Sequence, residues 1–263
     1  MKLTFLGTGT SQGVPVVACR CRVCASSDAR DNRLRTSALL AVGGRNILFD
    51  IGPDFRQQML RQRVDHLDAI LVTHAHRDHV GGLDDIRSFN YVQHRKMDIY
   101  LNREAADAIR RDYHYIFEPH IYPGLPEAEL HEVDGAFDIR WNATDGGTAI
   151  DELSVLPIHA MHKDLPVLGF RIGPMAYITD ANHIAPAELE KLQGVQLLVV
   201  NALRKEKHYS HFCLAEALEV VAQVNPERAY LTHMSHEMGL HDEVQRELPQ
   251  RVFLAYDNLE VEI

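Results

Sequence analysis

Short apolar runs alternate with stretches of helical periodicity along the whole chain of 263 residues. A short apolar run bounded by turn residues is typical of a buried strand, whereas apolar residues three and four positions apart indicate an amphipathic helix. Strands are therefore expected at Lys2–Leu6, Ser37–Val42, Asn46–Asp50, Ala69–Thr73, Asp98–Leu101, Leu153–Ile158, Leu168–Ile172, Met175–Thr179, Leu197–Asn201, Arg228–Thr232 and Val252–Ala255. Helices, several of them directly after a strand, are expected at Pro53–Gln62, Asn102–Asp112, Pro186–Leu192, Cys213–Val224 and His241–Glu247.

The predicted elements fall into two halves, each a series of strands punctuated by helices. Because a sheet must bury its apolar face against another layer, this order predicts an α/β fold, specifically a four-layer αββα sandwich with helices outside two packed sheets. No linker rich in Ser, Gly or Pro divides the chain, and it has no low-complexity segment. We therefore expect a single domain over residues 1–263.

The stretch from Phe89 to Gly135 is less regular than the rest of the chain. It gathers aromatic and proline residues, namely Tyr113, Tyr115, Phe117, Pro119, Tyr122, Pro123 and Pro126. Such insertions often form lids over functional sites, and equally often they are packed surface excursions. The sequence leaves both interpretations open.

Composition and charge narrow the class of protein. With 46% hydrophobic and 24% charged residues, the chain has an ordinary globular composition. Its formal net charge of -10 disfavours stable binding of nucleic acid, because polyanions are normally held by basic surfaces that release counterions. A small anionic substrate remains compatible with this charge, since bound metal ions would reverse the local field.

The chain shows no sign of export or membrane insertion. Residues 1–13 give an apolar strand and a Gly/Thr/Ser turn, without the basic and then apolar order of a signal peptide. No segment reaches the roughly 18 to 20 apolar residues that a membrane span needs. Cys19, Cys21 and Cys24 lie too close together for a disulfide framework and are typical of a metal clamp in a reducing compartment. We therefore expect a cytoplasmic protein without membrane contacts.

A cluster of potential metal ligands follows the apolar run at residues 69–72. The chain there reads Thr73-His74-Ala75-His76-Arg77-Asp78-His79 and continues with Val80 and two glycines. These ligands can converge because the turn at a strand end curls them together and glycine lets backbone segments pack closely. A lone histidine is usually a surface or core residue, but this cluster favours a metal site. His74 and His76 suit one ion. Asp78 and His79 are available to a second.

This His-x-His-x-Asp-His arrangement resembles the hallmark of the metallo-β-lactamase superfamily. The other positions of the superfamily pattern occur in order along nearly the whole chain. Asp50 matches the acidic residue that buttresses the site, and His162 matches the third histidine. Asp180 matches the carboxylate that bridges two metals, and His233 matches the last ligand. The resemblance implies the metallo-β-lactamase fold and a metal-dependent hydrolase.

The third histidine has two candidates, because both His159 and His162 follow the strand predicted at Leu153–Ile158. Relatives place this ligand six or seven residues before a glycine that begins the next strand. Gly169 occupies that place here, so the spacing favours His162.

Two metal ions bound by this ligand set would be able to catalyse hydrolysis. Ions roughly 3.5 to 4 Å apart lower the pKa of a shared water and hold both the attacking oxygen and the oxygen under attack. Imidazole and carboxylate ligands suit zinc, manganese or iron about equally well. Zinc is the first expectation and manganese the second.

A finer resemblance lies near the N-terminus. Cys19, Cys21 and Cys24, together with His236, resemble the zinc clamp of the PhnP-like phosphodiesterase subgroup, which is named for the carbon–phosphorus lyase pathway. Three cysteines and a histidine form a closed tetrahedral set without a vacancy for water, as a structural zinc requires. The resemblance implies one structural zinc besides two catalytic ions, and the clamp would tie the N-terminal loop to the strand end that carries His233. The alternative is that three free cysteines are close by chance.

His211 precedes a predicted helix and resembles the histidine that PhnP-like and tRNA-processing relatives place beside the phosphate. His208 is the rival for this position. An imidazolium suits the task of donating a proton to a leaving alkoxide, so Asp78 and His211 are the expected catalytic residues. The alternative for His211 is a capping or surface histidine. The remaining histidines are expected at the surface, among them His94, His131 and His241.

The resemblance implies hydrolysis of a small phosphodiester by a hydroxide that bridges two metals, and a cyclic ribose or nucleotide phosphate is one such substrate. One alternative is a cofactor-biosynthesis role like that of PqqB, whose family has a similar cysteine clamp. A tRNA 3′-processing endonuclease is disfavoured by the acidic chain and the lack of a long arm. Thioester and lactam hydrolases lack the clamp, and non-catalytic relatives usually lose ligands that this chain retains. A homodimer is compatible with the sequence.

Overall fold

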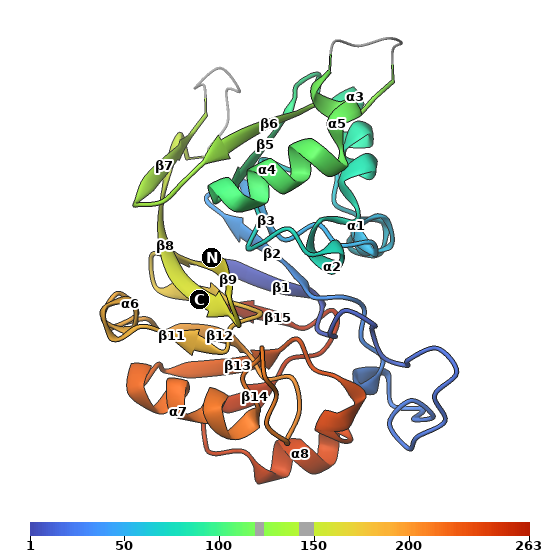
Figure 1. Cartoon of the computed structure of the whole chain (residues 1–263), viewed down its shortest axis with the longest axis vertical. Helices are drawn as coiled ribbons and strands as arrows, with labels where there is room; N and C mark the ends of the chain where they lie inside the picture. The colour runs from blue at the N-terminus through green and yellow to red at the C-terminus, as the bar shows by residue number, and fades with distance from the viewer. Residues whose placement is uncertain (119–123, 142–149) are drawn as a thin grey trace.

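The computed structural model describes residues 1–118, 124–141 and 150–263 and shows two β-sheets packed face to face (Figure 1). The first sheet has the strand order β15-β1-β2-β3-β4-β5-β6. Its strands are β1 (Lys2–Gly7), β2 (Ser37–Val42), β3 (Arg45–Phe49), β4 (Ala69–Leu71), β5 (Met97–Leu101), β6 (Ala128–Glu132) and β15 (Glu260–Glu262).

The second sheet comes from the other half of the chain. Its strand order is β11-β8-β9-β10-β12-β13-β14, and β7 pairs with β8 beside this path. Its strands are β7 (Phe137–Arg140), β8 (Glu152–His162), β9 (Leu165–Ile172), β10 (Met175–Ile178), β11 (His183–Ile184), β12 (Leu197–Asn201), β13 (Arg228–Thr232) and β14 (Val252–Leu254).

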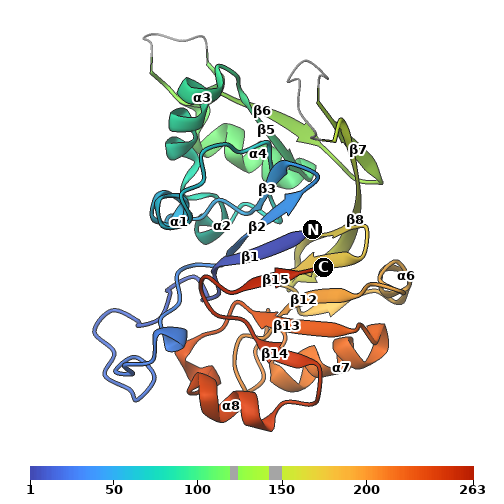
Figure 2. The same ribbon diagram turned by 180° about the vertical axis from the view of Figure 1, so that it is seen from behind.

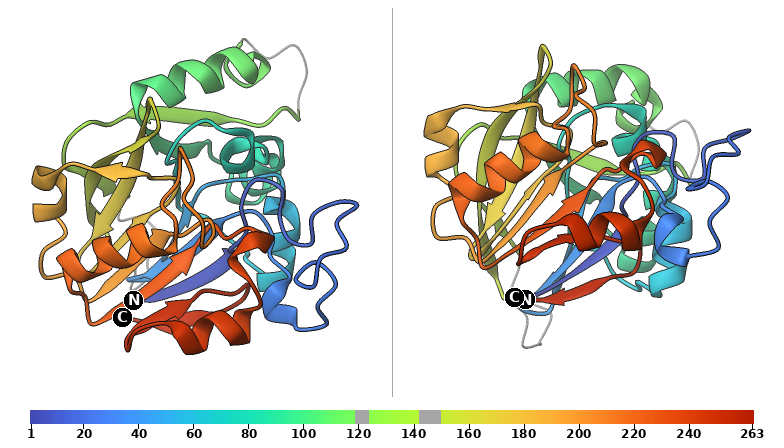
Figure 3. Two further views of the ribbon diagram at one scale, coloured as in Figure 1. Left: turned by 60° about the horizontal axis from the view of Figure 1, so that its bottom comes forward. Right: turned by 90° about the horizontal axis from the view of Figure 1, so that it is seen from below.

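Helices cover the outer faces of the two sheets, so that the molecule has four layers (Figure 3). Those on the side of the first sheet are α1 (Phe55–Gln62), α2 (Arg77–Val80), α3 (Arg87–Gln93), α4 (Arg103–Asp112) and α5 (His114–Phe117). Those on the side of the second sheet are α6 (Pro186–Glu190), α7 (Leu214–Val224) and α8 (His241–Glu247). Short 3₁₀ turns lie at Ala29–Asp31, Leu83–Ile86 and His236–Met238.

Apolar side chains fill the spaces between these layers. Between the sheets, the ring of Phe49 on β3 stacks on that of Tyr177 on β10 with centroids 4.6 Å apart. Phe55 of α1 packs in the core outside the first sheet, and Val220 of α7 packs in the core outside the second. Full burial of one large apolar side chain contributes about 1.5 to 3 kcal/mol. The middle core therefore binds the two halves of the chain firmly to each other.

The direction of the strands determines where a site can form. β3, β4, β5 and β6 are parallel, and so are β10, β12, β13 and β14. Parallel strands finish at the same edge of a sheet, and ligands of such sheets bind beyond the carboxyl ends of the strands. Residues that follow β3, β4, β10 and β13 are thus brought toward one end of the molecule.

The two ends of the chain lie side by side (Figure 2). β15 pairs antiparallel with β1, and the Ile263 amide donates a hydrogen bond to the Met1 carbonyl at 2.9 Å. The last strand therefore returns to the first sheet after the second sheet has been completed.

The observed architecture confirms the four-layer α/β sandwich expected from the sequence. Each strand and helix predicted from periodicity is present, with bounds that differ by a few residues. The sequence does not predict the polar or short strands β6, β7, β11 and β15, or the helices α2, α3 and α5. None of the helices in the described ranges is long and apolar enough to cross a membrane.

The stretch from residue 89 to residue 135 is more regular than expected, since it contains β5, α4, α5 and β6. Tyr113 is buried, and its hydroxyl donates to the Val80 carbonyl at 3.0 Å. This contact ties the described part of the stretch to α2, as a packed surface excursion would. Pro119, Tyr122 and Pro123 lie outside the described residues.

Candidate metal centre

The loop after β4 and the one-turn helix α2 carry the predicted His-x-His-x-Asp-His ligands. His74 and His76 lie on the loop, whereas Asp78 and His79 lie on the helix. A Cβ atom on Gly52 would lie 2.1 Å from the Asp78 carbonyl oxygen, so only glycine lets the turn after β3 approach α2 this closely. His74 and His79 are buried, and His76 is exposed.

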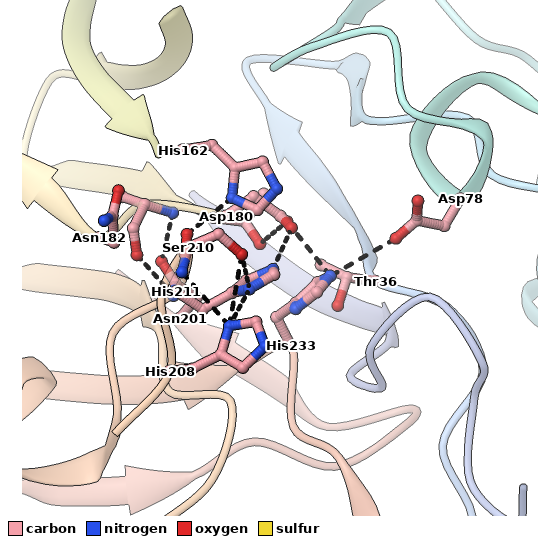
Figure 4. Close-up of polar contacts among 12 residues, drawn as sticks. Thr36, Asp78, His162, Asp180, Asn182, Asn201, His208, Ser210, His211 and His233 are labelled. Carbon is pink, nitrogen blue, oxygen red and sulfur yellow. Dashed lines mark hydrogen bonds and ion pairs between the residues drawn. The ribbon is translucent and has the colours of Figure 1, made fainter. Parts of the chain in front are cut away.

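Asp180 and His233 reach the same place from the second sheet (Figure 4). Asp180 follows β10, and His233 follows β13. Oδ2 of Asp180 lies 3.0 Å from Nε2 of His79 and 3.2 Å from Nε2 of His233. Oδ2 of Asp78 lies 3.2 Å from Nε2 of His79. One ligand atom from each of these four residues lies within 4.8 Å of the others, which is the grouping that a single metal ion requires.

A second group of rings gathers next to Asp180. The ring centroids of His74 and His76 are 4.5 Å apart, and those of His76 and His162 are 5.1 Å apart. His162, Asp180 and His211 also offer ligand atoms within 4.8 Å of one another. The ring Nδ1 of His162 donates to the Ser210 carbonyl at 2.7 Å, which leaves Nε2 as the free nitrogen. Asp180 thus lies between two groups of histidines, where a bridging carboxylate is expected.

The structure separates the two candidates for the third histidine. Nε2 of His159 lies 2.7 Å from the Asp134 carbonyl oxygen, and the side chain of His159 is 39% exposed. His162 is buried against the rings of His74 and His76. The geometry therefore brings His162, and not His159, to the predicted ligands.

Three residues of the site have a strained backbone. Asp50, Asp180 and His233 each follow a strand, and their φ angles are 58°, 55° and 58°. Non-glycine residues in this left-handed region cost on the order of 1 to 3 kcal/mol each and cluster at functional sites. This backbone conformation turns each side chain sharply out of the line of its strand.

Asp50 supports the site from behind. Its Oδ2 lies 2.8 Å from Nδ1 of His79, and its Oδ1 accepts a hydrogen bond from the Thr73 amide at 2.8 Å. A carboxylate can only accept at this distance, so Nδ1 of His79 is the donor and Nε2 faces Asp180. Asp50 is buried, which raises its pKa against the opposing effect of His79. This is the orienting role expected of an acidic residue behind a metal ligand.

Asn201 fixes the backbone next to Asp180, a contact that the sequence reasoning missed. Its Oδ1 accepts from the Ala181 amide at 2.8 Å, and its Nδ2 donates to the Ala181 carbonyl at 2.9 Å. Asn201 is buried at the end of β12. A polar residue that closes an otherwise apolar strand is the signal that could have identified it.

Burial keeps two of the ring ligands neutral. Desolvation lowers the pKa of His162 to about 4 and holds that of His74 well below its usual range. A metal binds the neutral imidazole, whose nitrogen lone pair is free. Both rings are therefore in the protonation state that a metal ligand needs at neutral pH.

The pKa values of His79 and Asp180 are shifted in the direction opposite to the effect of burial. Burial alone would lower the pKa of His79, but Asp180 and Asp78 outweigh it and raise that pKa well above the usual range. Burial alone would raise the pKa of Asp180, but His233 and His79 hold it well below its usual range. The excess of carboxylates at this point favours a positive charge, and a divalent cation would supply it.

Unpaired nitrogen atoms provide the test of whether a metal fits. Within the residues that the structure describes, Nε2 of His74, Nε2 of His79 and both ring nitrogens of His233 are buried without a hydrogen-bond partner. The carboxylate oxygens near His79 and His233 are close enough for ion pairing but lie in poor directions for hydrogen bonds. A buried polar atom without a partner costs about 1 to 3 kcal/mol. Bound metal ions would satisfy the Nε2 atoms, so the residues fit a metal centre.

The predicted clamp residues also come together. Nδ1 of His236 lies 3.4 Å, 3.3 Å and 3.5 Å from the Sγ atoms of Cys19, Cys21 and Cys24. The Cys24 amide and His236 lower the pKa of the Cys21 thiol to about 6, whereas burial raises that of Cys24 to about 11. These four side chains form the closed set that a structural zinc takes.

The clamp is joined to the catalytic ligands through the backbone. The Met234 amide donates to the Thr8 carbonyl at 2.9 Å, and the Thr10 amide donates to the Met234 carbonyl at 3.1 Å. Met234 directly follows His233, so the N-terminal turn holds the segment that presents this ligand.

His211 lies against Asp180, and His208 lies behind it (Figure 4). Nε2 of His211 is 2.8 Å from Oδ1 of Asp180, and its ring stacks on that of His233 with centroids 5.1 Å apart. Burial lowers the pKa of His211, and hydrogen bonding to Asp180 opposes this effect. The structure therefore places His211, rather than its rival, at the mouth of the centre.

One histidine that we expected at the surface is buried. His241, the first residue of α8, is 3% exposed, and its Nδ1 lies 3.4 Å from the Arg33 guanidinium. Its amide donates to Asp31 at 2.8 Å. The surface prediction for His241 is wrong because α8 packs onto the segment that follows the clamp. His94 is exposed, and His131 is partly exposed beside Asp98.

Comparison with known proteins agrees with this geometry. A protein-family model described as "Beta-lactamase superfamily domain" matches residues 45–234. A solved structure described as a new diphosphatase from the PhnP family is 33% identical, covers 100% of this chain and 97% of its own, and has a TM-score of 0.89. Zinc-bound PqqB from Methylobacterium extorquens, at 17% identity and a TM-score of 0.75 with full coverage of both chains, shares the fold.

A further relative is an octanoyltransferase of Porphyromonas gingivalis. It is 43% identical over 262 residues, which are 99% of this chain but 51% of that protein. This chain therefore spans about half the length of that relative.

Proposed function

This chain belongs to the metallo-β-lactamase superfamily as a metal-dependent hydrolase similar to the PhnP family, and from this premise we propose that it hydrolyses a small phosphodiester. The observation that carries the proposal is the arrangement around Asp180. Two groups of candidate metal ligands meet at this carboxylate, and we assign His211, whose Nε2 lies 2.8 Å from it, to proton donation rather than to a metal. Such a site can hold a phosphoryl group and protonate the oxygen that leaves it.

The ligands divide into two sets that share Asp180. We assign Asp78, His79, His233 and Asp180 to one set, which the structure groups together. We assign His74, His76, His162 and Asp180 to the other, because the rings of His74, His76 and His162 lie in contact and His162 is grouped with Asp180. When bound, two divalent ions, zinc first and manganese second, would activate a water and neutralise the charge of a phosphoryl group. The clamp would hold a separate structural zinc.

The remaining residues orient the ligand rings and supply a proton to the leaving group. Asp50 fixes the ring of His79, and the Ser210 carbonyl fixes the ring of His162. The proton on Nε2 of His211 is available to the oxygen of the leaving group, because this nitrogen faces the centre. The side chain of His211 is 12% exposed, so bulk water has little access to this proton. A small substrate also agrees with the net charge of -10, which a long polyanion would oppose.

A diphosphate is the second candidate substrate. The 33% identical relative of almost equal length is described as a diphosphatase. A diphosphate presents the same phosphoryl oxygens to the centre, but its leaving phosphate needs a proton less than an alkoxide does.

We also propose that the protein works in a reducing compartment such as the cytoplasm. The support for this is that the clamp cysteines form no disulfide in the described chain.

Substrate panels distinguish these functions. Protein loaded with zinc or manganese is assayed on bis-p-nitrophenyl phosphate, cyclic ribose phosphates, linear dinucleotides, a nucleoside diphosphate ester, a precursor tRNA and an octanoyl thioester. We expect turnover of one or more small phosphodiesters, with Asp180→Asn as the inactive control. Turnover of the diphosphate alone would favour the second candidate. Turnover of the tRNA or thioester alone, or of none of them by fully metal-loaded protein, would contradict the proposal.

A further inference from the structure

We propose that the groove between α1 and α3 is an interface between two copies of this chain, packed about a two-fold axis. Both helices lie on the outer side of the first sheet (Figure 2). None of the residues that line the groove is a candidate metal ligand or catalytic residue, so the inference does not depend on the proposed reaction. It gives a location to the homodimer that is compatible with the sequence.

The groove has an apolar floor and apolar edges. Its volume is about 550 Å³, and its lining includes the buried rings of Phe55 and Phe89, whose centroids are 6.0 Å apart. Leu60 of α1 and Val92 of α3 also line it and are 60% and 69% exposed. A single exposed apolar side chain needs no explanation, but several that line one groove indicate a contact surface.

One end of the groove carries Arg56 and Asp85. Arg56 directly follows Phe55 at the start of α1. A Cβ atom on Gly82 would lie 2.7 Å from Cβ of Phe55, and Asp85 comes one turn later in the chain. The start of α1 and the turn before α3 therefore lie side by side and bring one charge of each sign to this end.

The other end carries Arg63 and Asp65, which follow α1 in the chain. This end lies near the last residue of α3, because the Leu67 amide donates a hydrogen bond to Oε1 of Gln93 at 2.7 Å. Each end of the groove therefore has an arginine and an aspartate.

Most of these charges have no partner within the chain. Across residues 1–118, 124–141 and 150–263, the side chains of Arg56, Arg63 and Asp85 make no ion pair or hydrogen bond. Asp65 lies 2.8 Å from Nδ1 of His66. Two copies that each have a net charge of -10 repel each other, so they approach most easily where unpaired charges of both signs are available.

A two-fold axis through the groove would pair these charges. In such an interface the same patch serves both copies, and each contact occurs twice. The two grooves then run in opposite directions, so that Asp85 of one copy meets Arg63 of the other. Arg56 likewise meets Asp65. The exposed apolar edges of both grooves are buried in the same contact.

Other occupants fit the groove less well. A membrane surface with anionic headgroups attracts cations, so the aspartates at both ends would oppose it. A small apolar ligand could fill the floor but would leave the charges at the ends without partners. A second copy uses the floor, the edges and the charges of both signs.

Sedimentation of the metal-loaded full chain tests the inference. Wild type should form dimers at concentrations between about 1 and about 100 μM. Val92→Lys places an unpaired charge in the contact twice and should raise the dissociation constant by about 10- to 100-fold, as should Leu60→Lys. Val17→Lys, the same change at an exposed valine of the N-terminal loop, is the matched control. Circular dichroism and metal content verify that each variant is folded.

Charge reversal distinguishes a second copy from any other occupant. Arg63→Asp and Asp85→Arg should each weaken the dimer, because each places like charges opposite one another in both halves of the interface. An equal mixture of the two variants restores opposite charges at both places. It should form a heterodimer about as stable as the wild-type dimer.

A wild-type protein that stays monomeric over the whole concentration range would overturn the inference. A dimer that Val92→Lys and Leu60→Lys leave intact would do the same, as would one that Val17→Lys weakens equally. A mixture of Arg63→Asp and Asp85→Arg that associates no better than either variant alone would also overturn it.

Discussion

Asp180 is the side chain at which the contacts of the centre converge. Its two oxygens lie within 3.2 Å of Nε2 of His79, His211 and His233. Asn201 fixes the adjoining residue, and a positive φ of 55° turns Asp180 out of its strand. Because three histidines contact the negative charge of Asp180, a neutral side chain at this position cannot make the same interactions.

Removal of that charge should abolish the reaction while leaving the fold. In Asp180→Asn the side chain keeps its shape but loses the charge that would hold both ions. We expect kcat/KM for bis-p-nitrophenyl phosphate to fall by more than about 100-fold, with reduced metal content and an unchanged circular dichroism spectrum. Full turnover with two catalytic ions bound would show that another residue bridges the metals.

The two histidines near the end of β8 should behave differently. His162→Ala removes a ring that contacts His76 and faces Asp180, so we expect loss of one catalytic metal ion. His159→Ala removes a half-exposed ring bonded to a backbone carbonyl, and metal content should stay as in wild type. Elemental analysis of both variants checks this. Metal loss in His159→Ala alone would mean that the ligand is the earlier histidine.

At the residue scale, the sequence identifies most of the groups that meet at the centre, because ligand chemistry restricts them to a few residue types. His74 could be predicted from the cluster in which it lies, whereas Asp180 and His233 could be predicted only from the resemblance to the superfamily pattern. Asn201 offered only the signal of a polar residue that closes an apolar strand, and the Ser210 carbonyl, which accepts from His162, carries no pattern in the sequence. His208 and His211 needed the structure to tell which one touches Asp180.

At the element scale, the ends of the strands position the ligands of the centre, and the clamp helps to position the strand end that carries His233. The turn at Thr8 to Thr10 pairs with Met234, and the clamp cysteines follow that turn in sequence. The clamp residue His236, which contacts Cys21, lies only three residues after His233. Loss of the clamp should therefore affect a catalytic ligand that it does not touch.

Cys21→Ser should uncouple the clamp from the centre. Serine binds zinc poorly, so we expect loss of the structural zinc, a lower Tm and a several-fold lower kcat with catalytic metals in excess. Cys213→Ser, which alters a cysteine outside the clamp, is the control. Zinc content, Tm and rate are measured together. An unchanged zinc content in Cys21→Ser would contradict the clamp assignment.

The contact between α8 and the segment after the clamp should be sensitive to acid. Burial, together with Arg33, lowers the pKa of His241 to about 4, below its usual value of about 6.5. Between these values the unfolded chain binds a proton that the folded chain does not, so this group's share of the stability is lost as pH falls through that window. The other charged groups near the ring are Arg30, Asp28 and Asp31.

His241→Asn keeps an acceptor for Arg33 but does not titrate. Its Tm should therefore decline less than that of wild type as pH falls from about 7 to about 5, at equal metal content. Thermal unfolding of the two proteins across this range measures the difference. Parallel curves would show that His241 is protonated as easily in the folded protein as in the unfolded chain.

Strands and helices with a run or stripe of apolar residues could be predicted from the sequence. Polar strands and very short helices, which are held by their neighbours in the fold, could not. β6 and β15 have glutamates at several of their positions, so their sequences lack the apolar signal of a strand. α2 is a single turn, and a helix this short is not stable by its own propensity. Its backbone is held by contacts with the turn after β3, such as the Ile51 amide bonded to the His79 carbonyl at 2.7 Å.

At the scale of the whole molecule, each half contributes part of the centre and neither half completes it. Asp78 and His79 come from the first half, whereas His162, Asp180 and His233 come from the second. The core between the sheets and the return of β15 to the first sheet hold the halves in register. The net charge of -10 means that bound cations also relieve repulsion across the molecule.

The number of metal ions that activity requires is the most direct test of the account. Protein that keeps its clamp zinc but has been stripped of other metals is titrated with zinc or manganese, while phosphodiester hydrolysis and bound metal are followed together. Two ligand sets that share Asp180 predict that hydrolysis reaches its plateau when two further ions are bound per chain. A plateau at one further ion, or two bound ions without hydrolysis of any phosphodiester, would contradict it.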